Sequence, residues 1–175
     1  AELSSSSFDV GGFSISQESP TFIIAEIGNN HQGSLEMAKD LIDQAKDSGA
    51  DCVKFQMRNM DSLYGKSHKE GSSAEDLGSQ YILNLLSKYQ LSNQDLFKAF
   101  DYAYEREIVP LCTPWDISSL SKLEDYGMPA YKVASADLTN HDFLEVLAQT
   151  KKPLICSTGM STEDEILKTS RFLDL

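Results

Sequence analysis

The sequence predicts an α/β fold with a parallel sheet of about five strands, and two observations support this prediction. Five short apolar runs alternate with five longer segments whose apolar residues recur at helical spacing. Polar residues that can carry chemistry follow these runs at the points where the predicted strands end. Because repeated strand–helix units build parallel sheets through right-handed crossovers, we expect five consecutive units of this kind.

The elements follow one another along the whole chain. Apolar residues alternate around Gly11-Gly12, so the first part of the chain is predicted to be a leader and a small β-hairpin. Strands are predicted at residues 22–25, 52–57, 108–112, 130–134 and 153–156. Helices are predicted at 35–45, 96–103, 117–123, 143–147 and 166–173, with an extra helix at 77–89 and a long polar excursion at 61–78.

Several helix starts carry the residues that cap helices. Ser34 precedes the first helix at the N-cap position. Ser92 with Asp95, and Thr162 with Glu165, have the spacing of a capping box, in which the side chains satisfy the free N–H groups of the first turn. These signals fix where three of the predicted helices begin.

Two architectures can be built from such units: a (β/α)8 barrel of the TIM type and an open, doubly wound sheet. The turn after the first strand, residues 28–33 (GNNHQG), lacks the GxGxxG pattern of dinucleotide-binding folds, and no P-loop sequence occurs. The barrel therefore fits better, although five units are only part of its eight. We expect residues 1–20 to form the leader and hairpin and residues 21–175 a partial barrel domain, with an open five-stranded sheet as the alternative.

Charge and composition narrow the function classes. The 175 residues include 27 acidic and 15 basic side chains, a formal net charge of −12 at pH 7. A protein this acidic is not expected to bind nucleic acid or an anionic membrane, because both need a basic face. No apolar run approaches the roughly 20 residues that span a bilayer. The three cysteines form no CxxC pair, which indicates free thiols in a reducing compartment and favours a cytoplasmic enzyme.

The residues at the strand ends indicate an anion-binding site. Lys54 and Gln56 are two residues apart on one strand and therefore share a face, and Lys132 points away from its apolar neighbours. Thr113 and Ser157 follow two further strands. A single strand-end lysine usually reaches solvent, and a single hydroxyl residue usually caps a helix. Two inward lysines grouped with hydroxyls match a small, multiply charged anion such as a phosphorylated acid.

Three further residues have uses that the pattern leaves open. Ser135 is out of phase with Lys132, so the strand must bend or end between them if both are to reach the site. Glu26 can form an ion pair with Lys54 on the neighbouring strand, act as a general base beside the anion, or do both. His31 has no second ligand at metal-binding spacing, so a structural role is expected.

Five segments resemble, in order, motifs of the sialic acid synthase family. They are residues 24–33 (IAEIGNNHQG), 49–56 (GADCVKFQ), 113–114 (TP), 129–135 (PAYKVAS) and 153–160 (PLICSTGM). Members of this family condense phosphoenolpyruvate with N-acetylmannosamine or a related N-acetylated sugar and release phosphate. The resemblance also implies a (β/α)8 barrel, a divalent metal (Mn²⁺ or Mg²⁺), a C-terminal antifreeze-like domain and a homodimer.

The resemblance implies a role for each residue at the strand ends. The phosphate and carboxylate of phosphoenolpyruvate would be held by Lys54, Thr113, Lys132, Ser135 and Ser157. Glu26 would act as acid and base near the sugar aldehyde and the attacking water, and Gln56 would contact the sugar. The metal-binding histidines of the family have no counterparts in this chain, so no metal ligand is assigned to it.

Two other functions remain compatible with the residues. A Schiff-base aldolase would use Lys54 or Lys132 as its nucleophile, and a half-barrel without catalytic activity would only bind the anion. The synthase and the aldolase both imply small-molecule substrates and no nucleic-acid or membrane partner. Because the later residues of the family are missing, we expect the chain to be an incomplete portion, inactive alone and prone to self-association through its open sheet edges.

Overall fold

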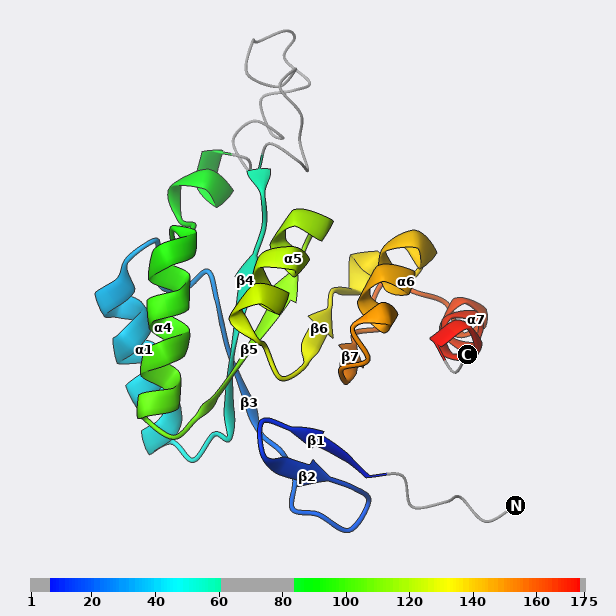
Figure 1. Ribbon diagram of the computed structural model, residues 1–175, viewed down its shortest axis with the longest axis horizontal. Coiled ribbons are helices and arrows are strands. Elements are labelled where there is room, and N and C mark those ends of the chain that lie inside the picture. Colours follow the sequence, from blue (N-terminus) through cyan, green and yellow to red (C-terminus); the bar gives the residue numbers. More distant parts are fainter. Residues whose placement is uncertain (1–6, 61–83, 174–175) are drawn as a thin grey trace, which may run out of the picture.

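The computed structural model describes residues 7–60 and 84–173 as a parallel sheet flanked by helices and a small β-hairpin (Figure 1). The elements are β1 (Phe8–Val10), β2 (Phe13–Ile15), β3 (Ile24–Gly28), α1 (Leu35–Asp47), β4 (Cys52–Met57), α4 (Asn93–Glu105), β5 (Val109–Pro114), α5 (Ile117–Tyr126), β6 (Tyr131–Val133), the 3₁₀ helix η2 (Ser135–Asp137), α6 (His141–Gln149), β7 (Leu154–Cys156) and α7 (Glu163–Leu173). The polar excursion and the first part of the extra helix lie outside the described residues, and residues 84–88 are helical. None of the described helices is long and apolar enough to cross a membrane.

The central sheet has the strand order β3-β4-β5-β6-β7, and all of its strand pairs are parallel. A doubly wound sheet reverses its order at a switch point and carries helices on both faces. An order without reversal, joined by right-handed crossovers, instead brings every helix to the same face. The sheet therefore has the order of a barrel segment, and its helices follow in chain order from α1 and α4 to α7 (Figure 1).

Pairing along this sheet is uneven. The six residues of β4 pair with the six residues of β5 in one continuous register. By contrast, β5 and β6 share a single registered pair, Cys112 with Tyr131. The short strands β6 and β7 then pair along their whole length. The sheet thus consists of a β3–β5 part and a β6–β7 part that meet at one registered pair.

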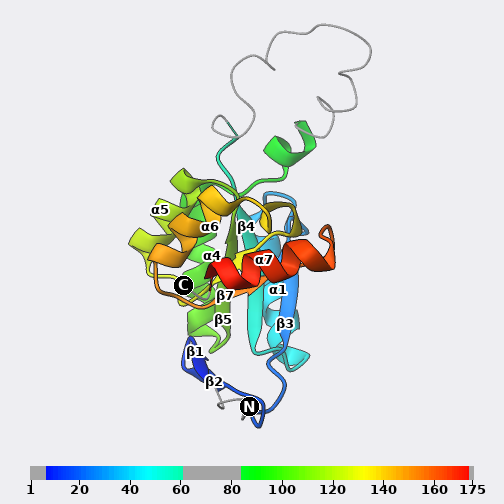
Figure 2. The same cartoon turned by 90° about the vertical axis from the view of Figure 1, so that its right-hand side faces the viewer.

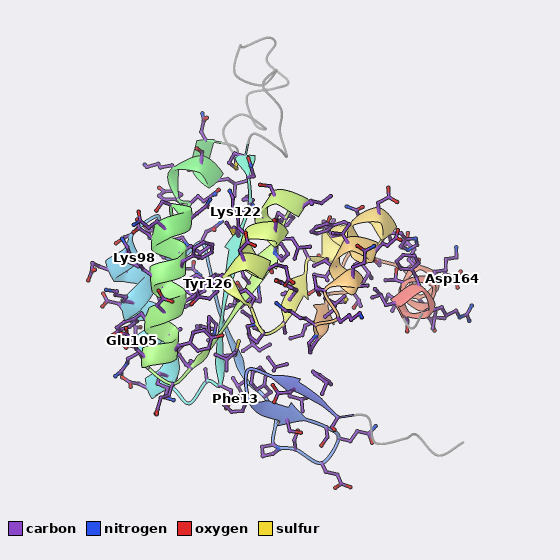
Figure 3. The ribbon with its side chains drawn as sticks, viewed as in Figure 1. Phe13, Lys98, Glu105, Lys122, Tyr126 and Asp164 are labelled. Carbon is purple, nitrogen blue, oxygen red and sulfur yellow. The ribbon has the colours of Figure 1, made fainter. Side chains whose placement is uncertain are left out.

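The outer face of the sheet forms the main core under the helices. Val53 and Phe55 are fully buried there, and the alternation along β4 sends Lys54 to the opposite face. The ring of Phe100 on α4 meets Phe55 edge-on, with 5.6 Å between centroids, and Tyr126 in the same way at 5.3 Å. Figure 3 shows Tyr126 between α4 and α5. The apolar residues thus fill the outer face of the sheet, while the inner face carries both apolar residues and the polar side chain of Lys54.

The β1–β2 hairpin covers the amino-terminal end of the inner face. Val10 is fully buried against Cys52 and Val109, the first residues of β4 and β5. Gly11 in the turn has a φ of +60°, and a Cβ there would lie 2.7 Å from the Val109 side chain, so only glycine allows this approach. Figures 1 and 2 both show the hairpin beneath the sheet. The predicted hairpin is confirmed, and a domain boundary near residue 20 stays a prediction.

The predicted helix starts are confirmed, with one notable shift in a strand. Ser34, Ser92 and Thr162 each accept a hydrogen bond from the backbone N–H three residues later. The first strand of the sheet, β3, starts two residues later than predicted and continues past Glu26. Its pairing with β4 begins at Ile24 opposite Cys52, so Phe22 and Ile23 of the predicted strand lie outside it.

Candidate functional site

The polar residues predicted for the site lie towards the carboxyl-terminal end of the inner face. Near the hairpin, the inward residues of the strands are apolar. Further along, the alternation presents Glu26 on β3, Lys54 and Gln56 on β4, Thr113 on β5 and Lys132 on β6. Barrel enzymes carry their sites at this end of the strands. The fold therefore brings these residues to one region.

Glu26 and Lys54 are register partners on neighbouring strands and form an ion pair. Lys54 is 8% exposed, whereas 51% of the Glu26 side chain is accessible. A lysine this buried needs a partner, because removing one member of such a pair leaves an uncompensated charge. The predicted ion pair is confirmed, and the accessible side of the Glu26 carboxylate is left open to a ligand.

Lys132 has neutral partners instead. Its ammonium donates hydrogen bonds to the Ser157 hydroxyl on the segment after β7 and, at 2.6 Å, to the carbonyl of Val133. The pKa of Lys132 lies below its ordinary value because burial disfavours the charged form and the Lys54 charge repels it. Two ammonium groups with one carboxylate give the region a local excess of positive charge, which attracts anions.

Gln56 lies beside Glu26, with Gly28 between them. The amide oxygen of Gln56 accepts a 2.7 Å hydrogen bond from the guanidinium of Arg58. A Cβ added to Gly28 would lie 3.1 Å from a carboxylate oxygen of Glu26 and 3.4 Å from the amide nitrogen of Gln56. Because Gly28 has a φ of +52° and no side chain, the carboxylate and the amide can both lie close to its backbone without a clash.

The remaining predicted residues, Thr113 and Ser135, are placed differently. Thr113 is buried and lies opposite Gln56 in the register between β4 and β5. The strand β6 ends at Val133, and Ser135 begins η2, so the strand ends before Ser135 as the phase argument required. Within the described part of the chain, no hydrogen bond joins Ser135 to the other predicted residues.

His31 braces the loop between β3 and α1. Its ring is buried, stacks on Phe55 with 6.1 Å between centroids, and accepts a 3.1 Å hydrogen bond at Nδ1 from the Gly33 N–H. Burial lowers its pKa, partly opposed by a hydrogen bond to the backbone of Gly28. These contacts match the structural role expected for this histidine.

The three thiols are free and sit in apolar surroundings. Cys52 and Cys112 are buried and Cys156 is half-buried. Burial raises the pKa of Cys52 to about 12 and also raises the pKa of Cys112 and Cys156. Because the thiolate is the nucleophile and these thiols stay protonated, they act as small apolar side chains.

Metal ions need a group of ligating side chains that the described part of the chain does not offer. Over residues 7–60 and 84–173, no group of three or more His, Cys, Asp and Glu side chains lies in an arrangement that could hold a metal. Glu26 is the accessible carboxylate in the site, and its partner is Lys54. The described residues alone therefore do not fit a metal centre.

Two residues beside the site were not predicted. Arg58 comes directly after β4 ends at Met57, at the two-residue spacing of the predicted inward residues, so the same alternation would have placed it on the inner face. Asp116 is the N-cap of α5 and accepts hydrogen bonds from the N–H groups of Ser119 and, at 2.7 Å, of Asn59. An aspartate directly before a helical apolar pattern is a recognised start signal.

Comparison with known proteins identifies relatives over nearly the whole chain. The NeuB family matches residues 41–174. An N,N'-diacetyllegionaminic acid synthase of Legionella pneumophila is 37% identical over 149 residues, covering 83% of this chain and 41% of that protein. The N-acetylneuraminate-9-phosphate synthase of Mus musculus is 34% identical over 148 residues, covering 83% and 41%. The chain spans less than half the length of these relatives.

Solved structures agree with these relatives. The sialic acid synthetase of Leptospira borgpetersenii, crystallised with citrate, superposes with a TM-score of 0.84 at 28% identity, covering 97% of this chain and 55% of that one. A DAHP synthase of Thermotoga maritima, with a TM-score of 0.67 at 13% identity, covers 97% and 43% and shows likeness of fold alone. Because the family match covers most of the chain, this protein belongs to the NeuB family.

Proposed function

We propose that this chain forms the phosphoenolpyruvate-binding half of a (β/α)8-barrel synthase. The reaction would join phosphoenolpyruvate to N-acetylmannosamine or a related N-acetylated sugar, giving a sialic-type nonulosonic acid and phosphate. One observation supports this function above the others. Lys54 on β4 and Lys132 on β6 lie near enough to repel each other electrostatically, and among the described residues only Lys54 of the two forms an ion pair with a carboxylate.

The charge of phosphoenolpyruvate suits this arrangement. Its phosphate and carboxylate are both anionic, and charge-assisted hydrogen bonds from lysine to such groups are about twice as strong as neutral ones. In the proposal, Lys54 and Lys132 neutralise the anion, with hydroxyls from Thr113 and Ser157 beside them. Ser135 would join them from the start of η2.

The proposed reaction balances without an oxidant or reductant. C3 of phosphoenolpyruvate forms a bond to the aldehyde carbon of the sugar, water adds at C2, and the bond from C2 to the phosphate oxygen breaks. The added water becomes the C2 carbonyl oxygen and loses two protons: one leaves with the phosphate, and the other ends on the former aldehyde oxygen. Glu26 would move that proton, because its carboxylate is accessible on the side that faces Gly28. Gln56, beside it, would contact the sugar, and the lysines would stabilise the developing negative charge.

A divalent metal, Mn²⁺ or Mg²⁺, stays a prediction from the resemblance. Such ions take oxygen-rich ligand sets, and the described residues do not supply one. No step above is therefore assigned to a metal. A cytoplasmic location and a homodimer likewise stay predictions.

Phosphate release tests the proposal directly. The protein expressed from its complete reading frame is incubated with phosphoenolpyruvate and a panel of N-acetylated sugars, with and without added Mn²⁺ or Mg²⁺. We expect phosphate only when both substrates are present, together with a product whose mass is that of the sugar plus a pyruvate unit. We expect none from the 175-residue chain alone. Release without any sugar would indicate a phosphatase and contradict the proposal.

A Schiff-base aldolase is the second candidate, because the lowered pKa of Lys132 favours the neutral amine that attacks a carbonyl. Borohydride added with pyruvate and the sugar separates the two. An aldolase leaves a reduced adduct on a lysine, whereas the synthase leaves the protein mass unchanged. Binding of phosphoenolpyruvate with neither adduct nor phosphate would identify a binding domain without catalytic activity.

A further inference from the structure

The contact between Arg58 and Gln56 fixes which end of the Gln56 amide faces the site. The two groups are 2.7 Å apart, and Arg58 is 8% exposed. Guanidinium nitrogens only donate hydrogen bonds, so the atom of Gln56 that faces Arg58 must be the amide oxygen. The amide nitrogen, with its two N–H donors, therefore points away from Arg58.

The nitrogen end lies close to Gly28, on the side of the Glu26 carboxylate. A Cβ at Gly28 would lie 3.4 Å from this nitrogen and 3.1 Å from a carboxylate oxygen of Glu26. The two groups thus flank the same space, one offering N–H donors and the other a carboxylate. A ligand that enters this space meets a donor on the Gln56 side.

Arg58 is itself held in place by several contacts. Its guanidinium lies over the ring of Trp115, 4.6 Å from the centroid. Its backbone carbonyl accepts a 2.6 Å hydrogen bond from the Gln90 side chain. The next N–H, that of Asn59, donates to the buried Asp116 at 2.7 Å. The side chain therefore reaches Gln56 from a braced position.

We propose that Arg58 is a positioning residue that makes Gln56 a hydrogen-bond donor to the sugar. The oxygen of the amide is occupied, so Gln56 recognises a sugar oxygen with free lone pairs over Gly28, a carbonyl or hydroxyl, and disfavours an N–H or ammonium group there. This inference rests on the proposed function and specifies how the site selects its acceptor substrate.

Kinetics of two variants test the consequence for the substrate. Gln56→Glu keeps an oxygen for Arg58 and turns a second oxygen, an acceptor, towards the sugar. We expect the KM for the sugar to rise about tenfold or more, with the KM for phosphoenolpyruvate within about twofold. Arg58→Met frees the amide to rotate and should raise the KM for the sugar severalfold. Arg106→Met, which breaks an exposed ion pair with Asp43 on the helical side, is the matched control.

The orientation itself has a separate readout. In a ¹H–¹⁵N spectrum of the uniformly labelled protein, the Gln56 side-chain signal is assigned by its loss in Gln56→Glu. We expect Arg58→Met to shift this signal and to speed exchange of its N–H protons, and Arg106→Met to leave it unchanged. An unchanged signal in a folded Arg58→Met protein would overturn the inference, as would an unchanged sugar KM in Gln56→Glu. If no sugar supports phosphate release, the proposed function fails, and the spectrum still decides the orientation.

Discussion

Lys54 and Lys132 occupy the same end of the same sheet, yet their surroundings differ in one respect. Lys54 pairs with the Glu26 carboxylate, whereas Lys132 donates to the Ser157 hydroxyl and the Val133 carbonyl. Burial, together with the repulsion from Lys54, lowers the pKa of Lys132. The charge of Lys54 is thus balanced by Glu26 within the protein, whereas the charge of Lys132 would be balanced by a bound anion.

Replacing the Glu26 carboxylate should have the largest effect, and this effect is on turnover. Glu26→Gln keeps the shape of the side chain but can no longer move a proton, and general acid–base catalysis contributes about 10²- to 10⁴-fold. We expect turnover to fall by that factor, while phosphoenolpyruvate binding does not weaken, because Lys54 remains and a carboxylate beside the anion is removed. Phosphate release and calorimetric titration measure the two quantities. Near-normal turnover would restrict Glu26 to the ion pair.

Removing each lysine in turn tests whether the two charges are unequal. Lys54→Ala deletes a charge-assisted contact, which costs roughly 10- to 150-fold in phosphoenolpyruvate affinity, and leaves Glu26 unpaired beside the anion. Adding Glu26→Gln should therefore restore part of the affinity. Lys132→Ala should lose a similar factor, and adding Glu26→Gln to it should restore less. If Glu26→Gln restores the phosphoenolpyruvate affinity equally in both double variants, Glu26 does not affect one lysine more than the other.

The comparison also predicts a dependence on pH. Lys132 loses its proton as the pH rises through a pKa that burial and the Lys54 charge hold below the ordinary lysine value. Affinity for the anion should then fall by up to about tenfold per pH unit above that pKa, and binding should take up protons in the same range. Titrations in two buffers of different ionisation enthalpy detect the uptake. Lys132→Arg, which stays charged, should flatten the profile, and a wild-type profile that is equally flat contradicts the prediction.

The smallest expected effect concerns the neutral partner of Lys132. Ser157→Ala removes one hydrogen bond to the ammonium, worth about 0.5–1.5 kcal/mol, so phosphoenolpyruvate affinity should fall by about 2- to 13-fold. Thr158→Ala removes a hydroxyl from the exposed neighbouring residue and serves as the control. Equal losses in the two variants would show that the Lys132–Ser157 contact has no part in binding.

Much of the fold could be predicted because its signals are local. Apolar periodicity gave the order of strands and helices, and caps such as Ser34 marked the helix starts. The strand order could not be read from such signals, since it depends on how strands pair across the sheet. The same holds for the start of β3, which the register with β4 sets at Ile24.

The site was predictable to the extent that alternation along a strand is regular. It placed Lys54, Gln56 and Lys132 on the inner face, as the structure shows. The same alternation extends to Arg58, two residues beyond Gln56. The Glu26–Lys54 ion pair was also expected, because the two residues lie on neighbouring strands. The contact of Lys132 with Ser157 depends on distances between strands, which spacing along the chain does not contain.

The single registered pair between β5 and β6 has a consequence for the motion of the sheet. Lys54 belongs to the part of the sheet before this junction and Lys132 to the part after it. An anion held by both ammonium groups links the two parts, because any widening at the junction would lengthen one of its contacts. Amide hydrogen exchange near Cys112 and Tyr131 should therefore slow when the anion binds, more than it slows in the long β4–β5 register.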